Sequence, residues 1–361
     1  MSVPGVRGQS PRIDQGRGAP SNPSGRFERL ALLSEPVDEF DPDDERPALA
    51  TEIFRDTSRS ILSTNESPDV GLDVYVNPYR GCEHGCIYCY ARPYHEYLGL
   101  SAGLDFESKI FVKEDAPALL RDALMARSWK PRPIGFSGVT DCYQPIERRL
   151  KITRGCLEVM AEFRNPVAII TKSSLITRDI DVLQSLAAHN AVQVVLSVTT
   201  LNDKLARAME PRAASPGRRL QAIRELAAAG IPVSVNVAPI IPGLTDHEIP
   251  AILKAAAEAG ATGAGRIVVR LPHGLKDLFD QWLETHAPER RNKVLGRVRD
   301  VRGGKLNDPS FGSRMSGEGP FAESIHQMFE LHRNRLGLTR RGELSVDSFR
   351  RPTAQQALFD D

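Results

Sequence analysis

Residues 75–90 read YVNPYRGCEHGCIYCY, and this stretch holds three of the five cysteines in a chain of 361 residues. Cys82, Cys86 and Cys89 follow the spacing C-x3-C-x2-C, and Tyr88 directly precedes the last of them. Thiolates are soft ligands, which select zinc or iron–sulfur clusters over hard cations such as Mg²⁺. The stretch therefore predicts a metal-binding loop.

The number of cysteines decides between the two kinds of metal site. A structural zinc ion takes four ligands, commonly from C-x2-C pairs, so zinc here would need a histidine such as His84 or His95. Three thiolates suit a 4Fe–4S cluster in which one iron is left open for a substrate or cofactor. We predict the cluster, with a zinc site or unrelated core cysteines as the alternatives.

The composition is that of a soluble globular protein, with 41% hydrophobic and 26% charged residues. A net charge of +1 gives no overall field that would attract nucleic acid or a membrane. Cysteines gathered in one tight motif indicate a reducing compartment rather than a disulfide framework. No apolar run approaches the ~18 residues of a membrane span, and the first residues, MSVPGVRGQSPR, lack the apolar core of a signal peptide. We expect a cytoplasmic protein with no membrane partner.

The chain divides by pattern into four segments. Residues 1–50 are rich in Pro, Gly, Ser, Arg and Asp and are predicted to form a disordered arm. Residues 68–273 alternate strand and helix patterns, which predicts a parallel sheet covered by helices. The predicted strands are 72–79, 133–140, 167–172, 192–200, 232–240 and 266–272. The helices predicted between them are 116–128, 147–163, 179–189, 216–229 and 246–259. Residues 274–340 are predicted to form a helical extension and residues 341–361 a flexible tail.

Two C-terminal features bear on partners. The segment 290–305 holds seven basic residues and one acid, a composition that favours phosphate contacts, although such charge runs are usually solvated faces. In the tail, Gln355, Leu358 and Phe359 match three positions of the pentapeptide with which bacterial proteins dock on the replication sliding clamp. Both features lean towards DNA or RNA as a partner.

The C-x3-C-x-aromatic-C motif resembles that of the radical S-adenosylmethionine (SAM) superfamily, in which the open iron of the cluster binds the amino and carboxylate groups of SAM. This resemblance implies a partial (β/α)6 barrel with the cluster loop after the first strand. The segments TDCYQPIE (140–147) and 210–240 are also similar to a bacterial group related to spore photoproduct lyase. The resemblance spans about residues 73–272.

The resemblance implies roles for individual residues. The metal ligands would be Cys82, Cys86 and Cys89, and the residues binding SAM would be Tyr88, Ser137, Lys172, Ser197, Thr199, Glu210 and Arg219. Arg219 would pair with the SAM carboxylate, although a structural ion pair between Glu210 and Arg219 is an equal alternative. Tyr88 and Tyr90 match a tyrosine pair that relays a radical in the lyase. The lyase's hydrogen-donor cysteine has no counterpart at 138–141, so Cys142 is the remaining candidate for that role, against a half-buried core cysteine.

The implied activity is reductive cleavage of SAM to a 5′-deoxyadenosyl radical, which abstracts hydrogen from a substrate. The reducing partner would be a flavodoxin or ferredoxin, and we expect DNA or RNA as substrate. Two alternatives stay open, modification of a protein or small molecule and a non-catalytic iron–sulfur or zinc-binding protein.

Overall fold

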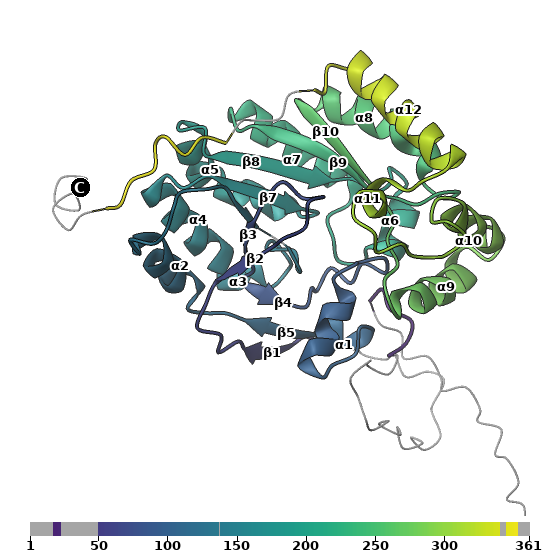
Figure 1. Ribbon diagram of the computed structural model, residues 1–361, viewed down its shortest axis with the longest axis horizontal. Coiled ribbons are helices and arrows are strands. Elements are labelled where there is room, and N and C mark those ends of the chain that lie inside the picture. The colour runs from purple at the N-terminus through teal and green to yellow at the C-terminus, as the bar shows by residue number, and fades with distance from the viewer. Residues whose placement is uncertain (1–16, 23–49, 137, 340–343, 353–361) are drawn as a thin grey trace, which may run out of the picture.

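The computed structural model describes residues 17–22, 50–136, 138–339 and 344–352. Its centre is a seven-stranded sheet in the order β10-β9-β8-β7-β6-β3-β2 (Figure 1). Six of these strands, β3 and β6 to β10, are parallel, and β2 pairs antiparallel with β3 at one edge. The strands are β2 Leu62–Thr64, β3 Val74–Val76, β6 Ile134–Phe136, β7 Val167–Thr171, β8 Val192–Ser197, β9 Val233–Ile240 and β10 Gly263–Val268.

The parallel strands form where the sequence has short apolar runs of β-branched residues. Such runs favour strands that are covered on both faces, and β9 is buried along almost its whole length. Each of the six parallel strands lies beside the next parallel strand in chain order. Between two such strands, a helical connection returns the chain to the end of the sheet at which the strands begin. All six predicted strands are present, so the expected (β/α)6 arrangement is confirmed.

Helices cover the sheet. Those within the repeating units are α2 Ala116–Met125, α3 Glu147–Leu150, α4 Ile152–Phe163, α5 Ile180–Ala187, α6 Asp203–Met209, α7 Pro216–Ala228 and α8 Ile249–Glu258. Short 3-10 helices span Arg92–Leu98, Ser174–Asp179 and Asp246–Glu248. The predicted helix 147–163 is in fact two helices, because Lys151 adopts a left-handed backbone conformation with φ of 54°.

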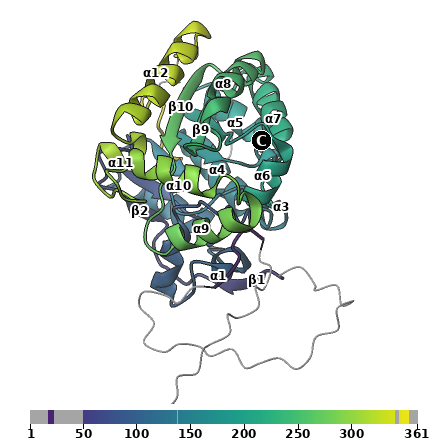
Figure 2. The same ribbon diagram turned by 90° about the vertical axis from the view of Figure 1, so that its right-hand side faces the viewer.

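The C-terminal extension is helical, as predicted, with α9 Leu275–His286, α10 Arg291–Asp300, α11 Ser313–Ser316 and α12 Pro320–Arg335. Figure 2 shows α12 beside α8 at the β10 edge of the sheet. The apolar side of α9, including Phe279 and Trp282, belongs to the same hydrophobic cluster as Ile87 and Tyr88. The extension therefore packs directly on the cysteine loop.

A second, three-stranded sheet has no counterpart among the predicted elements. It consists of β1 Glu52–Arg55, β5 Lys109–Val112 and β4 Tyr79–Arg80, and the short helix α1 Leu104–Ser108 precedes β5. All four residues of β1 are exposed, so its sequence has no alternation of buried and exposed positions. Backbone pairing with β5 forms this strand, and such pairing leaves no pattern in the side chains.

The predicted disordered arm needs a correction at residues 17–22. The backbone N–H of Arg17 donates to Glu107 at 2.5 Å, and Ala19 is buried. The Arg17 guanidinium also donates to Thr51 Oγ1 at 2.7 Å. This segment is therefore held against the folded chain, whereas the rest of the predicted arm up to residue 49 lies outside the described residues. Within the described residues, no helix is long and apolar enough to cross a membrane.

Candidate functional site

The three clustered cysteines lie on the loop that follows the first parallel strand. Cys82 and Cys86 are buried, Cys89 is partly buried, and all three line one cavity of about 180 Å³ that is partly open to solvent. No group of three or more His, Cys, Asp or Glu side chains in the described part of the chain is placed to hold a single metal ion. Three thiols that line one cavity fit a cluster, in which each cysteine would bind a different iron.

Burial raises the pKa of each of the three thiols above its ordinary value. Without metal, the thiols are therefore protonated near neutral pH. Metal binding requires the thiolate form, so loading of this site releases protons and adds metal–sulfur bonding to the stability of the loop.

Arg92 supports the cysteine loop through hydrogen bonds from its side chain to the backbone of the loop. Its side chain is fully buried and donates to the carbonyl oxygens of Gly85 and Cys86, each at 2.9 Å. The same guanidinium donates to Glu107 Oε2 at 2.7 Å, so its charge is balanced. Gly18 of the N-terminal segment also packs closely against the loop. A Cβ atom at position 18 would lie 1.8 Å from the carbonyl oxygen of Gly85, so no side chain fits there. The cysteine positions are thus set by a packed support.

The rest of the cavity wall comes from the carboxyl ends of the parallel strands, where active sites of parallel barrels lie. Its strand-end residues are Thr140, Asp141, Thr171, Lys172, Ser197, Asn236, Ala238, Val268 and Arg270. Of the predicted SAM-binding residues, Tyr88, Lys172 and Ser197 line the cavity, and the predicted relay residue Tyr90 does too. Ser137 lies outside the described residues. The roles of these side chains remain predictions, although their positions are now known.

Asp141 is held as a carboxylate in the cavity wall. Burial by itself raises the pKa of Asp141, but the neighbouring His84 and two hydrogen-bond donors outweigh this effect and lower the pKa to about 2. The donors are the backbone N–H of Lys172 at 2.8 Å and Thr171 Oγ1 at 2.7 Å. Asp141 thereby joins the loop after β6 to the end of β7 and fixes the backbone of Lys172. The Nζ of Lys172 lies 5.6 Å from the centre of the Tyr88 ring.

The predicted residues Thr199, Glu210 and Arg219 form a buried network behind the cavity rather than part of its lining. Glu210 accepts hydrogen bonds from Tyr88 Oη, from Thr199 Oγ1 and from the Arg219 guanidinium. Arg219 is 1% exposed and also donates to the carbonyl oxygen of Ser197 at 3.0 Å. Its donors are therefore engaged by acceptors inside the protein, which agrees with the structural ion pair, and its pairing with the SAM carboxylate stays a prediction.

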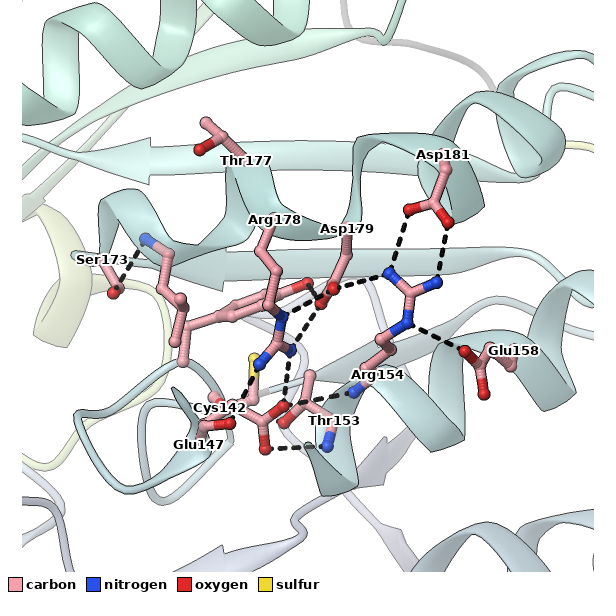
Figure 3. Close-up of polar contacts among 12 residues, drawn as sticks. Cys142, Glu147, Thr153, Arg154, Glu158, Ser173, Thr177, Arg178, Asp179 and Asp181 are labelled. Carbon is pink, nitrogen blue, oxygen red and sulfur yellow. Dashed lines mark hydrogen bonds and ion pairs between the residues drawn. The ribbon is translucent and has the colours of Figure 1, made fainter. Parts of the chain in front are cut away.

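Cys142 also lies away from the cavity. Its side chain is fully buried in the main hydrophobic core, and Thr153 Oγ1 donates to its backbone carbonyl at 2.6 Å. Figure 3 shows it beside a network of ion pairs in which Arg178 contacts Glu147 and Asp179, each at 2.7 Å. The structure therefore places Cys142 in the core and not in the cavity lining, and its role as hydrogen donor stays a prediction.

The predicted basic segment 290–305 is only partly available for a ligand. Arg302 is 3% exposed and donates to the carbonyl oxygens of Val268 and Val269, which ties the end of β10 to the extension. Arg291 pairs with Asp280 at 2.7 Å. Arg302 therefore stabilises the fold and is not available to a ligand. The sequence pattern did not distinguish this buried arginine from its exposed neighbours.

Several residues of the site were missed from the sequence. Arg92 and Glu107 were not singled out, because the residue type alone does not show whether a charged side chain is buried or exposed. Asn236 and Arg270 lie in the predicted strands 232–240 and 266–272. A polar residue in a predicted strand of the barrel was the only sequence signal that could have pointed to them. The aromatic segment after the last cysteine is a 3-10 helix in which His95 is buried and Tyr94 and Tyr97 are exposed.

Comparisons with known proteins agree with this geometry. The family model described as the radical SAM superfamily matches residues 76–256. An uncharacterized protein of Mycobacterium tuberculosis is 35% identical over 239 residues, which cover 65% of this chain and 69% of that protein. A Pseudomonas phage M6 protein named radical SAM Nalpha-GlyT isomerase is 26% identical over 292 residues, 79% of this chain and 56% of its own length.

Among solved structures, a spore photoproduct lyase variant superimposes with a TM-score of 0.60 at 16% identity, covering 81% of this chain and 82% of its own. The lyase complexed with dinucleoside spore photoproduct gives a TM-score of 0.57 at 16% identity, covering 79% of each chain. At such identity these structures show a shared fold. The family model, which matches half of the chain, establishes that the chain belongs to the radical SAM superfamily of enzymes.

Proposed function

We propose that Cys82, Cys86 and Cys89 hold a 4Fe–4S cluster and that SAM binds beside it in the cavity. The observation that carries this proposal is that three thiols share one cavity wall with the carboxyl ends of the parallel strands. When bound, the cluster and SAM supply reductive cleavage of SAM to methionine and a 5′-deoxyadenosyl radical, which takes a hydrogen atom from the substrate.

The chain's own residues bind and orient the ligands. Lys172 and Ser197 reach into the cavity from the ends of β7 and β8 and offer a cation and a hydroxyl for the polar groups of SAM. The ring of Tyr88 forms an apolar wall, and its hydroxyl is held by Glu210, so the ring cannot turn freely. Tyr90 is fixed similarly by a 2.7 Å hydrogen bond to the carbonyl oxygen of Gly138. These two hydrogen bonds hold the tyrosine rings in fixed positions along the cavity wall.

For the substrate, we propose a nucleic acid. The fold shared with spore photoproduct lyase and the exposed basic residues of segment 290–305 support this class. Modification of a protein or small molecule is the alternative within the same chemistry, and a non-catalytic metal protein is the alternative outside it. We further propose a cytoplasmic location, which rests on the clustered cysteines of the sequence. The electron donor would be a flavodoxin or ferredoxin.

A contact with the replication sliding clamp through Gln355, Leu358 and Phe359 is a separate proposal. These three residues lie outside the described residues, so it rests on the sequence pattern alone. Binding of a synthetic peptide with residues 350–361 to purified clamp tests it, with Phe359→Ala as the control peptide. Equal binding by both peptides, or none by either, removes it.

The decisive experiment on function is anaerobic. The protein is reconstituted with iron and sulfide, reduced with dithionite and supplied with SAM, and 5′-deoxyadenosine is measured. A variant with Cys82, Cys86 and Cys89 all changed to Ala is run beside it. The proposal requires a brown protein and product from the wild type only. A colourless protein that retains zinc after reconstitution excludes it, as does product formed equally by the variant.

A further inference from the structure

Arg270 is a cavity residue with no role in the account given so far. It lies two residues beyond the end of β10 and lines the cavity that contains the cysteines. Its guanidinium carbon lies 5.6 Å from the centre of the Tyr90 ring, so the cation rests against an aromatic face at the cavity wall.

The guanidinium of Arg270 lacks a good acceptor among the described residues. Its Nε is buried without a hydrogen bond, and Nη1 has a thioether partner, Met315 Sδ, at 3.8 Å. No carboxylate of the described residues lies within ion-pair distance of Arg270. The acid nearby, Asp69, is committed to the Arg314 guanidinium and to the N–H of Gly312 at 2.6 Å. Burial and the adjacent Arg314 lower the pKa of Arg270.

Among the described residues, three fully buried arginines have oxygen acceptors that the half-buried Arg270 lacks, although the Nε atoms of Arg302 and Arg333 are also buried without a hydrogen bond. Arg92 and Arg219 each pair with a buried glutamate. Arg302 donates to three backbone carbonyl oxygens. A planar guanidinium with five donors is costly to bury without acceptors, and it matches a phosphate or carboxylate by two parallel hydrogen bonds. An oxyanion entering the cavity would supply the missing acceptors.

The surroundings of Arg270 favour a phosphate that is attached to bases. Tyr90 is 42% exposed and Phe311 60% exposed, while Arg314 lies over the Phe311 ring at 4.4 Å. Tyr94, which is 51% exposed, is a further aromatic residue on the 3-10 helix that follows the cysteine loop. Exposed aromatic rings interleaved with arginines are the usual platform for single-stranded nucleic acid, because bases stack on the rings and phosphates bind the cations.

We propose that Arg270 binds a backbone phosphate of a nucleic acid strand and so positions the strand over the cavity, with flanking bases on Tyr90, Tyr94 and Phe311. This inference rests on the proposed function, because it takes the cavity to be the reaction site. It assigns the strand an entry point on the β10 side of the cavity. Arg270 is in this sense a positioning residue.

The test compares two probes of identical sequence. One is a short single-stranded deoxyoligonucleotide with normal phosphodiester links, and the other carries neutral methylphosphonate links. Dissociation constants for both, and for SAM, are measured on the anaerobically reconstituted wild type, Arg270→Gln and Arg270→Lys. The matched control is Arg266→Gln. Arg266 lies within β10, four residues before Arg270, and does not line the cavity. Its guanidinium rests over the Phe329 ring at 5.7 Å and contacts His326 Nδ1 at 2.6 Å.

We expect the wild type and Arg266→Gln to prefer the charged probe, and Arg270→Gln to lose roughly tenfold or more of that preference, the usual size of a charge-assisted hydrogen bond. Arg270→Lys should fall between them. Equal preference in Arg270→Gln and Arg266→Gln overturns the inference, as does the absence of binding by either probe, which would point to a protein or small molecule. If the SAM affinity of Arg270→Gln falls by the same factor, the guanidinium serves the SAM carboxylate instead. Failure of SAM cleavage by the wild type is a separate outcome that removes the proposed function.

Discussion

Arg92 Nη2 and Glu107 Oε2 form a fully buried ion pair at 2.7 Å, and the same guanidinium contacts the backbone of the cysteine loop. Arg92 comes from the short 3-10 helix that follows the loop, and Glu107 comes from α1. Glu107 also accepts the backbone N–H groups of Arg17 and Gly18, so one carboxylate joins the loop support to the N-terminal segment. The cysteine loop is therefore tied to two parts of the chain through a single acid.

The first prediction concerns Glu107→Gln. Removing one charge of a buried pair leaves the other uncompensated, so the free energy of unfolding should fall by about 3–5 kcal/mol. The control is Glu162→Gln, which breaks the Arg121–Glu162 pair, whose side chains are 45% and 34% exposed. That change should cost less than about 1 kcal/mol. Urea denaturation measures both, and similar losses in the two variants would contradict the assigned importance of Glu107.

The second prediction concerns iron content. Cys86→Ala removes a thiol from the cavity wall, and after anaerobic reconstitution the bound iron should fall at least about tenfold. Cys156→Ala is the matched control, because Cys156 is fully buried in the core on α4 and does not line the cavity. It should keep its iron while losing some stability. Equal iron in the two variants, measured per folded protein, would remove Cys86 from the ligand set.

The third prediction concerns the N-terminal segment. In Gly18→Ala the new methyl group would overlap the carbonyl oxygen of Gly85, so residues 17–22 should detach from the loop, at a cost of about 1–3 kcal/mol. Trypsin cleavage after Arg17, followed by mass spectrometry, should then become about tenfold faster. Gly217→Ala is the control, since nothing lies within 4 Å of its added Cβ. An unchanged cleavage rate in Gly18→Ala would mean that the segment does not protect this site.

The parallel core could be predicted because each strand is a buried apolar run between turn residues. Lys172 and Ser197 were expected in the site through the resemblance to radical SAM enzymes, and both line the cavity. Arg219 could not be placed by the same reasoning. It lies on α7, and whether its side chain faces the cavity or the interior depends on the rotation of the helix, which tertiary packing decides.

Interactions between distant segments left no trace in the local pattern. The exposed strand β1 pairs through its backbone, and its side chains carry no alternation. The contact of Gly18 with Gly85 depends on the lack of side chains at two positions 67 residues apart. Sequence periodicity reports on burial within one element and therefore misses contacts of this kind.

The last prediction concerns pH. His95 is 2% exposed, packs edge-on against Phe106 with ring centres 5.7 Å apart, and has a pKa that burial lowers to about 4. The unfolded chain binds a proton at about pH 6.5 and the folded chain does not until about pH 4. Stability should therefore be complete above pH 6.5 and fall by about 3 kcal/mol as the pH drops to 4. The loss should reach about 1.4 kcal/mol for each pH unit in that window.

Denaturant unfolding between pH 7.5 and 4 measures this dependence, with His95→Phe as the comparison. Phenylalanine retains the aromatic packing with Phe106 and cannot bind a proton, so the part of the pH slope due to position 95 should vanish. The two curves should then converge or cross towards pH 4, where the histidine protein has lost its advantage. Parallel curves across the whole range would show that His95 titrates alike in the folded and unfolded chain, and that its burial does not govern stability in acid.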